Sequence, residues 1–123
     1  MNLVLRRFAI ATAIAILPTL ALAQAPAKAM NGMLASNDGM TLYTFDKDAG
    51  GKSACNGACA GIWPPLKAAG DAKDSGDWTL VARDDGSKQW AFKGKPLYTY
   101  SKDSKAGDMA GDGIGGAWHT IKQ

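Results

Sequence analysis

The sequence predicts a mainly β fold: a small antiparallel β domain built from two tandem repeats, with little helix. Three observations lead to this fold class. The chain has fifteen glycines, and its acidic residues are all aspartate. Outside residues 1–23, its apolar residues fall in short alternating runs. Glycine and aspartate favour turns over helix interiors, and alternating runs bounded by turn residues are typical of strands.

The segment at 1–23 has the pattern of a secretory signal peptide. Arg6 and Arg7 precede an apolar, uncharged run over residues 8–23, which ends in Ala-Leu-Ala before Gln24. A charged start, a short apolar run and an Ala-x-Ala end are the parts of a cleavable signal. The run is shorter than the roughly 20 residues of a membrane span. We therefore expect a periplasmic or secreted product with no stable membrane span after cleavage.

The remaining residues have the length of one small domain. We expect a signal peptide at 1–23, a flexible leader at 24–32 and a single two-repeat domain at 33–123, in which a linker at 67–77 separates the repeats at 33–66 and 78–123. Without the two arginines of the signal, the formal net charge falls from +3 to +1. A charge this small does not favour nucleic acid as a partner.

Two segments of the chain repeat at a constant offset. The run "GMTLYTFDKD" at 39–48 aligns with "GKPLYTYSKD" at 94–103, and the same offset relates Trp63 to Trp118. Each repeat therefore contains a strand, a glycine-rich loop and a tryptophan. We refer to residues 46–63 as the first loop and to residues 101–118 as the second loop.

Each repeat also contains a short β-prone run. Residues 42–45 and 97–100 alternate, so leucine and threonine share one face of the strand and the two aromatics share the other. Turns before these runs predict upstream hairpin partners at 33–36 and 88–92. Two further strands are expected, at 78–83 and 117–121.

The first loop carries two cysteines that the second loop lacks. Cys55 and Cys59 are four positions apart, and two cysteines in an exported chain usually form one disulfide. A tight turn can bring such a pair within disulfide range, and we predict this bond. The alternatives are a redox-active pair, or a metal site that uses Cys55, Cys59 and His119.

Other chemistries fit the sequence less well. Gly51-Lys52-Ser53 resembles the end of a phosphate-binding loop, but the first glycine of that motif falls on Asp46. The aspartates of the second loop lack EF-hand spacing, and no serine stands in a Gly-x-Ser-x-Gly elbow. We predict no cofactor and no catalytic residue, and we favour a non-catalytic protein over an enzyme.

The paired motifs resemble those of a bacterial secreted-repeat family, whose members are known as predicted lipoproteins with a Tyr-x-[Phe/Trp/Tyr]-x-x-Asp motif. The motif residues are Tyr43, Phe45 and Asp48 in the first repeat and Tyr98, Tyr100 and Asp103 in the second. The Cys-x3-Cys and Trp-Pro-Pro segments are also similar to the family pattern. The resemblance implies aromatics that pack on one side of a strand, with the aspartate fixing the loop that follows. Many members are lipoproteins, but this chain lacks a cysteine at the predicted cleavage site.

These observations together predict a non-catalytic exported domain with a binding or structural role in the cell envelope. Its partner would be an envelope component or a small ligand. The alternative is a periplasmic protein that handles redox equivalents, copper or zinc through Cys55 and Cys59. The resemblance supplies no catalytic or ligand-binding residues that would decide between these functions.

Overall fold

The computed structural model describes residues 26–123, so the predicted signal peptide and the start of the predicted leader, at 24–25, lie outside the described residues. The elements in chain order are β1 (Ala27–Met30), β2 (Met33–Ser36), β3 (Tyr43–Phe45), α1 (Ala58–Ile62), β4 (Lys67–Ala68), β5 (Trp78–Ala82), β6 (Lys88–Phe92), β7 (Lys95–Pro96), the 3-10 turn η1 (Ile114–Gly116) and β8 (Trp118–Thr120). Every pair of these strands is antiparallel. The predicted fold class is therefore confirmed.

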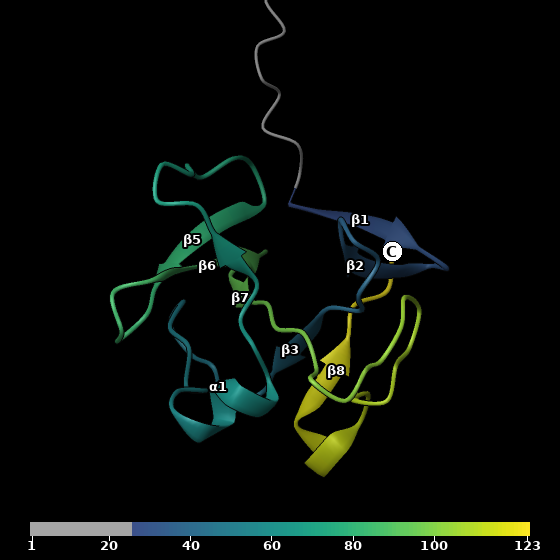
Figure 1. Ribbon diagram of the computed structural model, residues 1–123. Coiled ribbons are helices and arrows are strands. Elements are labelled where there is room, and N and C mark those ends of the chain that lie inside the picture. The colour runs from purple at the N-terminus through teal and green to yellow at the C-terminus, as the bar shows by residue number, and fades with distance from the viewer. Residues whose placement is uncertain (1–25) are drawn as a thin grey trace, which may run out of the picture.

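Each repeat opens with a β-hairpin. β1 pairs with β2 in the first repeat, and β5 pairs with β6 in the second. The two hairpins lie on opposite sides of the molecule, with β3 and β8 in the region between and below them (Figure 1). The strands predicted at 33–36 and 88–92 are β2 and β6. The strands predicted at 78–83 and 117–121 are each slightly shorter, as β5 and β8.

The expectation of a flexible leader at 24–32 is wrong for the part that forms β1. Asn31 and Gly32 have left-handed φ values of 52° and 76°, which make the tight turn between β1 and β2. Ala27 is buried beside Leu34 in an apolar cluster. The run Ala-Lys-Ala-Met lacks β-branched and aromatic residues, so hairpin pairing and burial decide its conformation rather than its intrinsic propensity.

The closing segment of each repeat pairs with the other repeat. β8, from the second repeat, pairs with β3 of the first, and the Leu34 N–H donates to the Ile121 carbonyl at 2.8 Å. β4 lies in the predicted linker but pairs with β6 of the second repeat, and the Leu66 N–H donates to the Leu97 carbonyl at 2.9 Å. Figure 1 shows the contribution of the second repeat to this exchange, with the C-terminus lying beside β2.

One of the two predicted hairpin pairings differs from the structure. The upstream hairpin partner expected for residues 42–45 reaches only the start of that run, where the Leu42 N–H donates to the Leu34 carbonyl at 3.1 Å. β3 itself pairs with β8. In the second repeat, β7 does pair with β6, as the Lys93-Gly94 turn predicts.

The strand predicted at 97–100 is also not regular. β7 ends at Pro96, and within the predicted run only Tyr98 makes bridges, to Tyr43 and Pro65. The segment facing this run contains Pro64 and Pro65, which have no N–H to donate. The equivalent segment of the second repeat has residues with N–H groups at these positions, and there a regular ladder forms between β3 and β8.

Two buried clusters lie on the two faces of the motif segments. Leu42 and Leu97 are fully buried in an aliphatic cluster, and Tyr43 and Tyr98 are fully buried in an aromatic cluster. The alternation of leucine and tyrosine therefore sends successive side chains into different cores, as the sequence predicts. The aromatic cluster joins the two repeats, and it positions both loops.

Candidate functional site

The two family motifs meet at a pair of buried tyrosines. Tyr43 and Tyr98 exchange backbone hydrogen bonds of 2.8 and 3.0 Å. The Tyr43 hydroxyl donates to Asp103 at 2.7 Å, and the Tyr98 hydroxyl donates to Asp48 at 2.7 Å. The aspartate of each motif therefore binds the tyrosine of the other repeat.

The same two aspartates fix the loops that follow them. Asp48 accepts a hydrogen bond from the Ala54 N–H at 2.6 Å, and Asp103 accepts one from the Ala110 N–H at 2.9 Å. Each carboxylate thus ties its own loop to the tyrosine of the opposite repeat. This is the role in fixing the loop that the family resemblance implies, with the added link between repeats.

Burial raises the pKa of both phenols, Tyr43 and Tyr98, so both stay protonated at neutral pH. It raises the pKa of Tyr98 to about 12, and it raises the pKa of Tyr43 further above the ordinary value. Burial also raises the pKa of Asp48, while its hydrogen bonds to Ala54 and Tyr98 oppose that change. At neutral pH the tyrosines are therefore hydrogen-bond donors rather than bases or nucleophiles.

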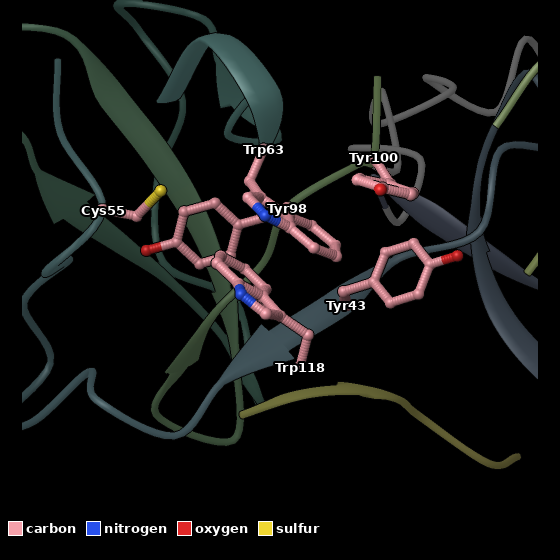
Figure 2. Packing of buried hydrophobic residues seen from close by; sticks show 6 residues of the cluster. All are labelled: Tyr43, Cys55, Trp63, Tyr98, Tyr100 and Trp118. Carbon is pink, nitrogen blue, oxygen red and sulfur yellow. The ribbon is translucent and has the colours of Figure 1, made fainter. Parts of the chain in front are cut away.

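The repeat tryptophans form the centre of the aromatic cluster. Trp63 and Trp118 are stacked with ring centroids 3.8 Å apart and planes within 3°. Phe45 stacks on Trp118 and Tyr100 stacks on Trp63, both at 4.2 Å, which gives a stack of four rings. Figure 2 shows Trp63, Trp118 and the three tyrosines of the cluster. This ring stack is built equally from both repeats.

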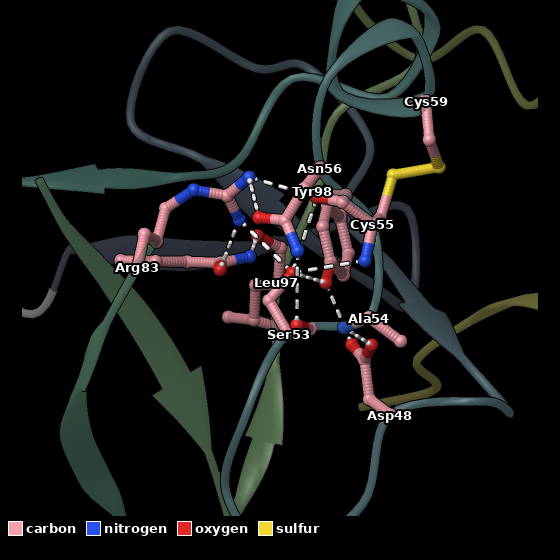
Figure 3. Close-up of a disulfide and its surroundings, with 10 residues drawn as sticks. Asp48, Ser53, Ala54, Cys55, Asn56, Cys59, Arg83, Leu97 and Tyr98 are labelled. Carbon is pink, nitrogen blue, oxygen red and sulfur yellow. Dashed lines mark hydrogen bonds between the residues drawn. A yellow bond between two sulfur atoms is a disulfide. The ribbon is translucent and has the colours of Figure 1, made fainter. Parts of the chain in front are cut away.

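Cys55 and Cys59 form a disulfide with Cα atoms 5.2 Å apart, so the predicted bond is confirmed. Cys55 is fully buried in the aromatic cluster, and the partly buried Cys59 lies near the start of α1. Figure 3 shows the disulfide at one end of a polar network that contains Arg83. The disulfide therefore closes a loop that also binds a charged side chain.

Arg83 is the centre of this network and is only 7% exposed. One guanidinium nitrogen, Nη1, donates to Gln89 Oε1 at 2.8 Å and to Ser53 Oγ at 3.0 Å. The other, Nη2, donates to the Cys55 carbonyl at 2.8 Å and to Asn56 Oδ1 at 3.3 Å. Three contacts of the first loop therefore depend on one arginine from the second repeat.

A chain of hydrogen bonds connects Arg83 to the half-buried carboxylate of Asp48. Ser53 Oγ lies 2.6 Å from the Tyr98 hydroxyl, which donates its proton to Asp48. Since the phenol has one proton, Ser53 donates to the phenol oxygen and accepts from Arg83. The guanidinium and the carboxylate are thus linked through two hydroxyl groups, without direct contact.

The sequence does not reveal the roles of Arg83, Gln89 and Ser53. Arg83 ends a predicted strand, where an arginine is ordinarily exposed. Gln89 is fully buried and donates to the Leu97 carbonyl at 2.7 Å, although glutamine is rarely buried. Only the three-dimensional approach of the two repeats gives these side chains their partners.

His119, the third residue of the alternative metal site, pairs with Asp46. His119 Nε2 and Asp46 Oδ2 are 2.8 Å apart, and the two side chains are 45% and 57% exposed. Both cysteine sulfurs are joined to each other. Within residues 26–123, no three or more histidine, cysteine, aspartate or glutamate side chains are grouped so that they could hold a metal ion.

A groove of about 390 Å³ lies beside the His119–Asp46 pair. It is bounded by β3, β8, the β6–β7 hairpin and the residues after β8. Three exposed lysines line it, namely Lys93, Lys95 and Lys122. The half-buried side chains of Phe92 and Ile121 supply apolar surface. We call this feature the basic groove.

The first repeat carries different residues at most of the matching positions, although Lys122 corresponds to Lys67 and Thr44 to Thr99. At the offset that relates the two repeats, Lys93, Lys95 and His119 correspond to Asp38, Met40 and Pro64. Both repeats nevertheless form the same tyrosine, aspartate and tryptophan contacts. The side chains of Lys93, Lys95 and His119 are therefore not required by the architecture that the repeats share.

The fold and these contacts define a class of protein: a small two-repeat β domain whose halves exchange closing strands and motif contacts. The chain belongs to the Lipoprotein_15 family, described as a secreted repeat of unknown function, which matches residues 27–67 and 79–122. The first match includes β1 and the start of β4, in agreement with the strand found in place of the expected leader. No curated protein and no solved structure matches the chain.

The family description gives secretion for proteins of this kind. Among the helices of residues 26–123, none is both long enough and apolar enough to cross a membrane. The α-helix of this part of the chain, α1, has only five residues.

Proposed function

We propose that this chain is a non-catalytic binding domain of the cell envelope, located in the periplasm, which takes a small ligand in the basic groove. One observation carries the proposal: three polar side chains of the groove, those of Lys93, Lys95 and His119, are not needed by the shared repeat architecture. Its volume of about 390 Å³ lies within the usual range of ligand sites, roughly 300–1,000 Å³.

The buried chemistry of the domain supports a non-catalytic role. Each buried tyrosine donates to a buried or half-buried aspartate, and Arg83 donates to four acceptors of the protein itself. No buried side-chain nitrogen or oxygen among the described residues lacks a hydrogen-bond partner. A general acid or base must instead reach a substrate atom. These groups serve the scaffold, and loops or turns on such a scaffold commonly carry the binding residues.

A fragment screen followed by amide NMR shifts tests this function on the oxidised mature protein. We expect ligands to shift amides of β8 and the β6–β7 hairpin. The matched surface around Asp38, Met40 and Ser101 serves as an internal control and should not respond. Shifts confined to that control surface, or turnover of a screened compound, would contradict the proposal.

The disulfide supports a second candidate, in which the domain exchanges electrons with a periplasmic dithiol. The observation in its favour is the partly buried Cys59 beside the fully buried Cys55, since exchange requires an accessible sulfur. Equilibration with a thiol redox buffer decides between the two. A reduction potential below about −300 mV marks a structural bond, whereas a potential near about −200 mV would favour the redox function.

A further inference from the structure

We infer that the basic groove takes a small anion with an apolar part, such as an aromatic phosphomonoester, and that Lys93 is a specificity-determining residue. This inference rests on the proposed function, because it names the ligand class of the same groove. The groove is lined by three lysines and by one aspartate, Asp46, which is itself paired with His119. The charge of the lining therefore favours an anion.

The conformation of Lys93 gives an independent reason. Lys93 and Gly94 have φ values of 51° and 81°, and they make the tight turn of the β6–β7 hairpin. Asn31 and Gly32 make a two-residue turn with similar φ values, 52° and 76°, in the β1–β2 hairpin, which is at a different position of the repeat. Asparagine suits the left-handed region and lysine does not. A lysine at this position is therefore explained by its side chain rather than by the turn.

The Lys93 side chain is placed where it can act on a groove ligand. Its Nζ lies 5.3 Å from the centroid of the Phe92 ring, within cation–π range, and both residues line the groove. The ammonium group of Lys93 can bind the anionic part of a ligand, and the adjacent Phe92 ring can pack against its apolar part. Ile121 adds to the apolar surface of the groove.

Three probes separate the contributions of charge and apolar surface. Phenyl phosphate carries both features, inorganic phosphate carries only the charge, and benzyl alcohol carries only the ring. In amide NMR titrations at low salt, we expect phenyl phosphate to bind most tightly and to shift amides of β8 and the β6–β7 hairpin. Its affinity should fall steeply as salt rises to about 0.5 M, because salt screens exposed charges.

Substitution of Lys93 by asparagine gives the sharpest test, since it should move binding and stability in opposite directions. In Lys93→Asn, the affinity for phenyl phosphate should fall about threefold, the usual effect of losing one exposed charge pair. The melting temperature should rise by about 2–4 °C, because asparagine fits the turn. The control Lys102→Asn, outside the groove, should leave affinity unchanged.

The triple variant Lys93→Asn/Lys95→Asn/Lys122→Asn should lose about tenfold or more in affinity for phenyl phosphate. An unchanged affinity in this variant would overturn the inference. Equal binding of benzyl alcohol in the groove would also overturn it, while leaving the proposed binding function intact. Equal affinities for phenyl phosphate and inorganic phosphate would refute the apolar half of the inference.

The fragment screen tests the proposed function separately. If the amides of the groove respond to no fragment, the proposed binding function itself is refuted.

Discussion

The first and second loops occupy equivalent places in the two repeats but are held by different forces. The first loop is closed by the Cys55–Cys59 disulfide and binds the buried guanidinium of Arg83. The second loop has neither, and it is held by close packing and by hydrogen bonds to the backbone. The same repeat architecture therefore accommodates a first loop that is held by a disulfide and a buried arginine, and a second loop that is held by close packing.

Gly111 shows how the second loop is held. A Cβ atom at this position would lie 2.7 Å from the Trp63 ring and 3.0 Å from the Tyr100 ring. The Gly111 N–H also donates to the Tyr43 hydroxyl at 3.2 Å. The second loop thus lies directly on the ring stack, whereas the first loop surrounds a polar network. The disulfide accordingly belongs to the loop that surrounds the polar network, where Cys55 is itself packed in the aromatic cluster.

The largest expected effect is the loss of Arg83. Arg83→Leu should destabilise the protein by about 3–5 kcal/mol, because it leaves neutral acceptors of Gln89 and the first loop without their donor, and each unsatisfied buried group costs about 1–3 kcal/mol. Urea unfolding measures the change, and hydrogen exchange should show lost protection in the first loop alone. Arg83→Lys is the matched control that keeps the charge but not the fork of donors. A loss below about 1 kcal/mol in Arg83→Leu would mean that the network adds little to stability.

Loss of the hydroxyl group should cost more stability at Tyr43 than at Tyr98. Tyr43→Phe should cost about 2–3 kcal/mol, because it removes the partner of the buried Asp103 and of the Gly111 N–H. Tyr98→Phe should cost about 1–2 kcal/mol, since Asp48 is less buried than Asp103. Chemical denaturation of both variants gives the comparison. Equal costs would show that the two motifs are energetically equivalent despite their different loops.

Removing the disulfide should have a smaller and more local effect. The closed loop is short, so the chain-entropy estimate for Cys55→Ala/Cys59→Ala is about 2 kcal/mol. Hydrogen exchange should show faster opening of α1 and residues 53–56, with the second loop unchanged. Global unfolding in the absence of denaturant would instead mean that the disulfide holds the whole domain.

The smallest effect concerns alkaline pH. The folded pKa of Tyr98 is raised to about 12 from the ordinary value near 10. The raised pKa means that the stabilising contribution of this phenol is complete below about pH 10 and is lost as pH rises toward 12. Tyrosinate absorbance and urea unfolding between these pH values measure the loss. Tyr98→Phe is the control, and it should show a shallower decline than the parent protein.

The elements within each repeat can be predicted from the sequence more completely than the pairing of the strands. The constant offset between the repeats, the alternation of leucine and tyrosine and the disulfide all follow from local pattern. β1 is not predictable in this way, because its alanines and lysine carry no strand preference and depend on the turn at Asn31. The interruption after Pro96 depends on Pro64 and Pro65, which face it from another part of the chain.

The candidate site is less predictable than the fold for a related reason. The sequence assigns Asp48 and Asp103 to their own loops, whereas their bonds to the tyrosines of the opposite repeat require the two motifs to meet. Arg83 shows no sign of burial in its local sequence, since its acceptors come from residues 53–56 and from Gln89. Lys93 is visible as a turn residue, but only the φ value distinguishes it from an ordinary surface lysine.

The exchange of closing strands has a consequence for what counts as a folding unit. Residues 27–67 alone would lack β8 beside β3, and residues 79–122 alone would lack β4 beside β6. Either half expressed separately would have to find a second copy to complete its strands and satisfy its tyrosine. Cleavage between residues 70 and 76 would leave all of these contacts in place. The two repeats are in this sense arranged like the subunits of a strand-exchanged dimer that one covalent connection joins.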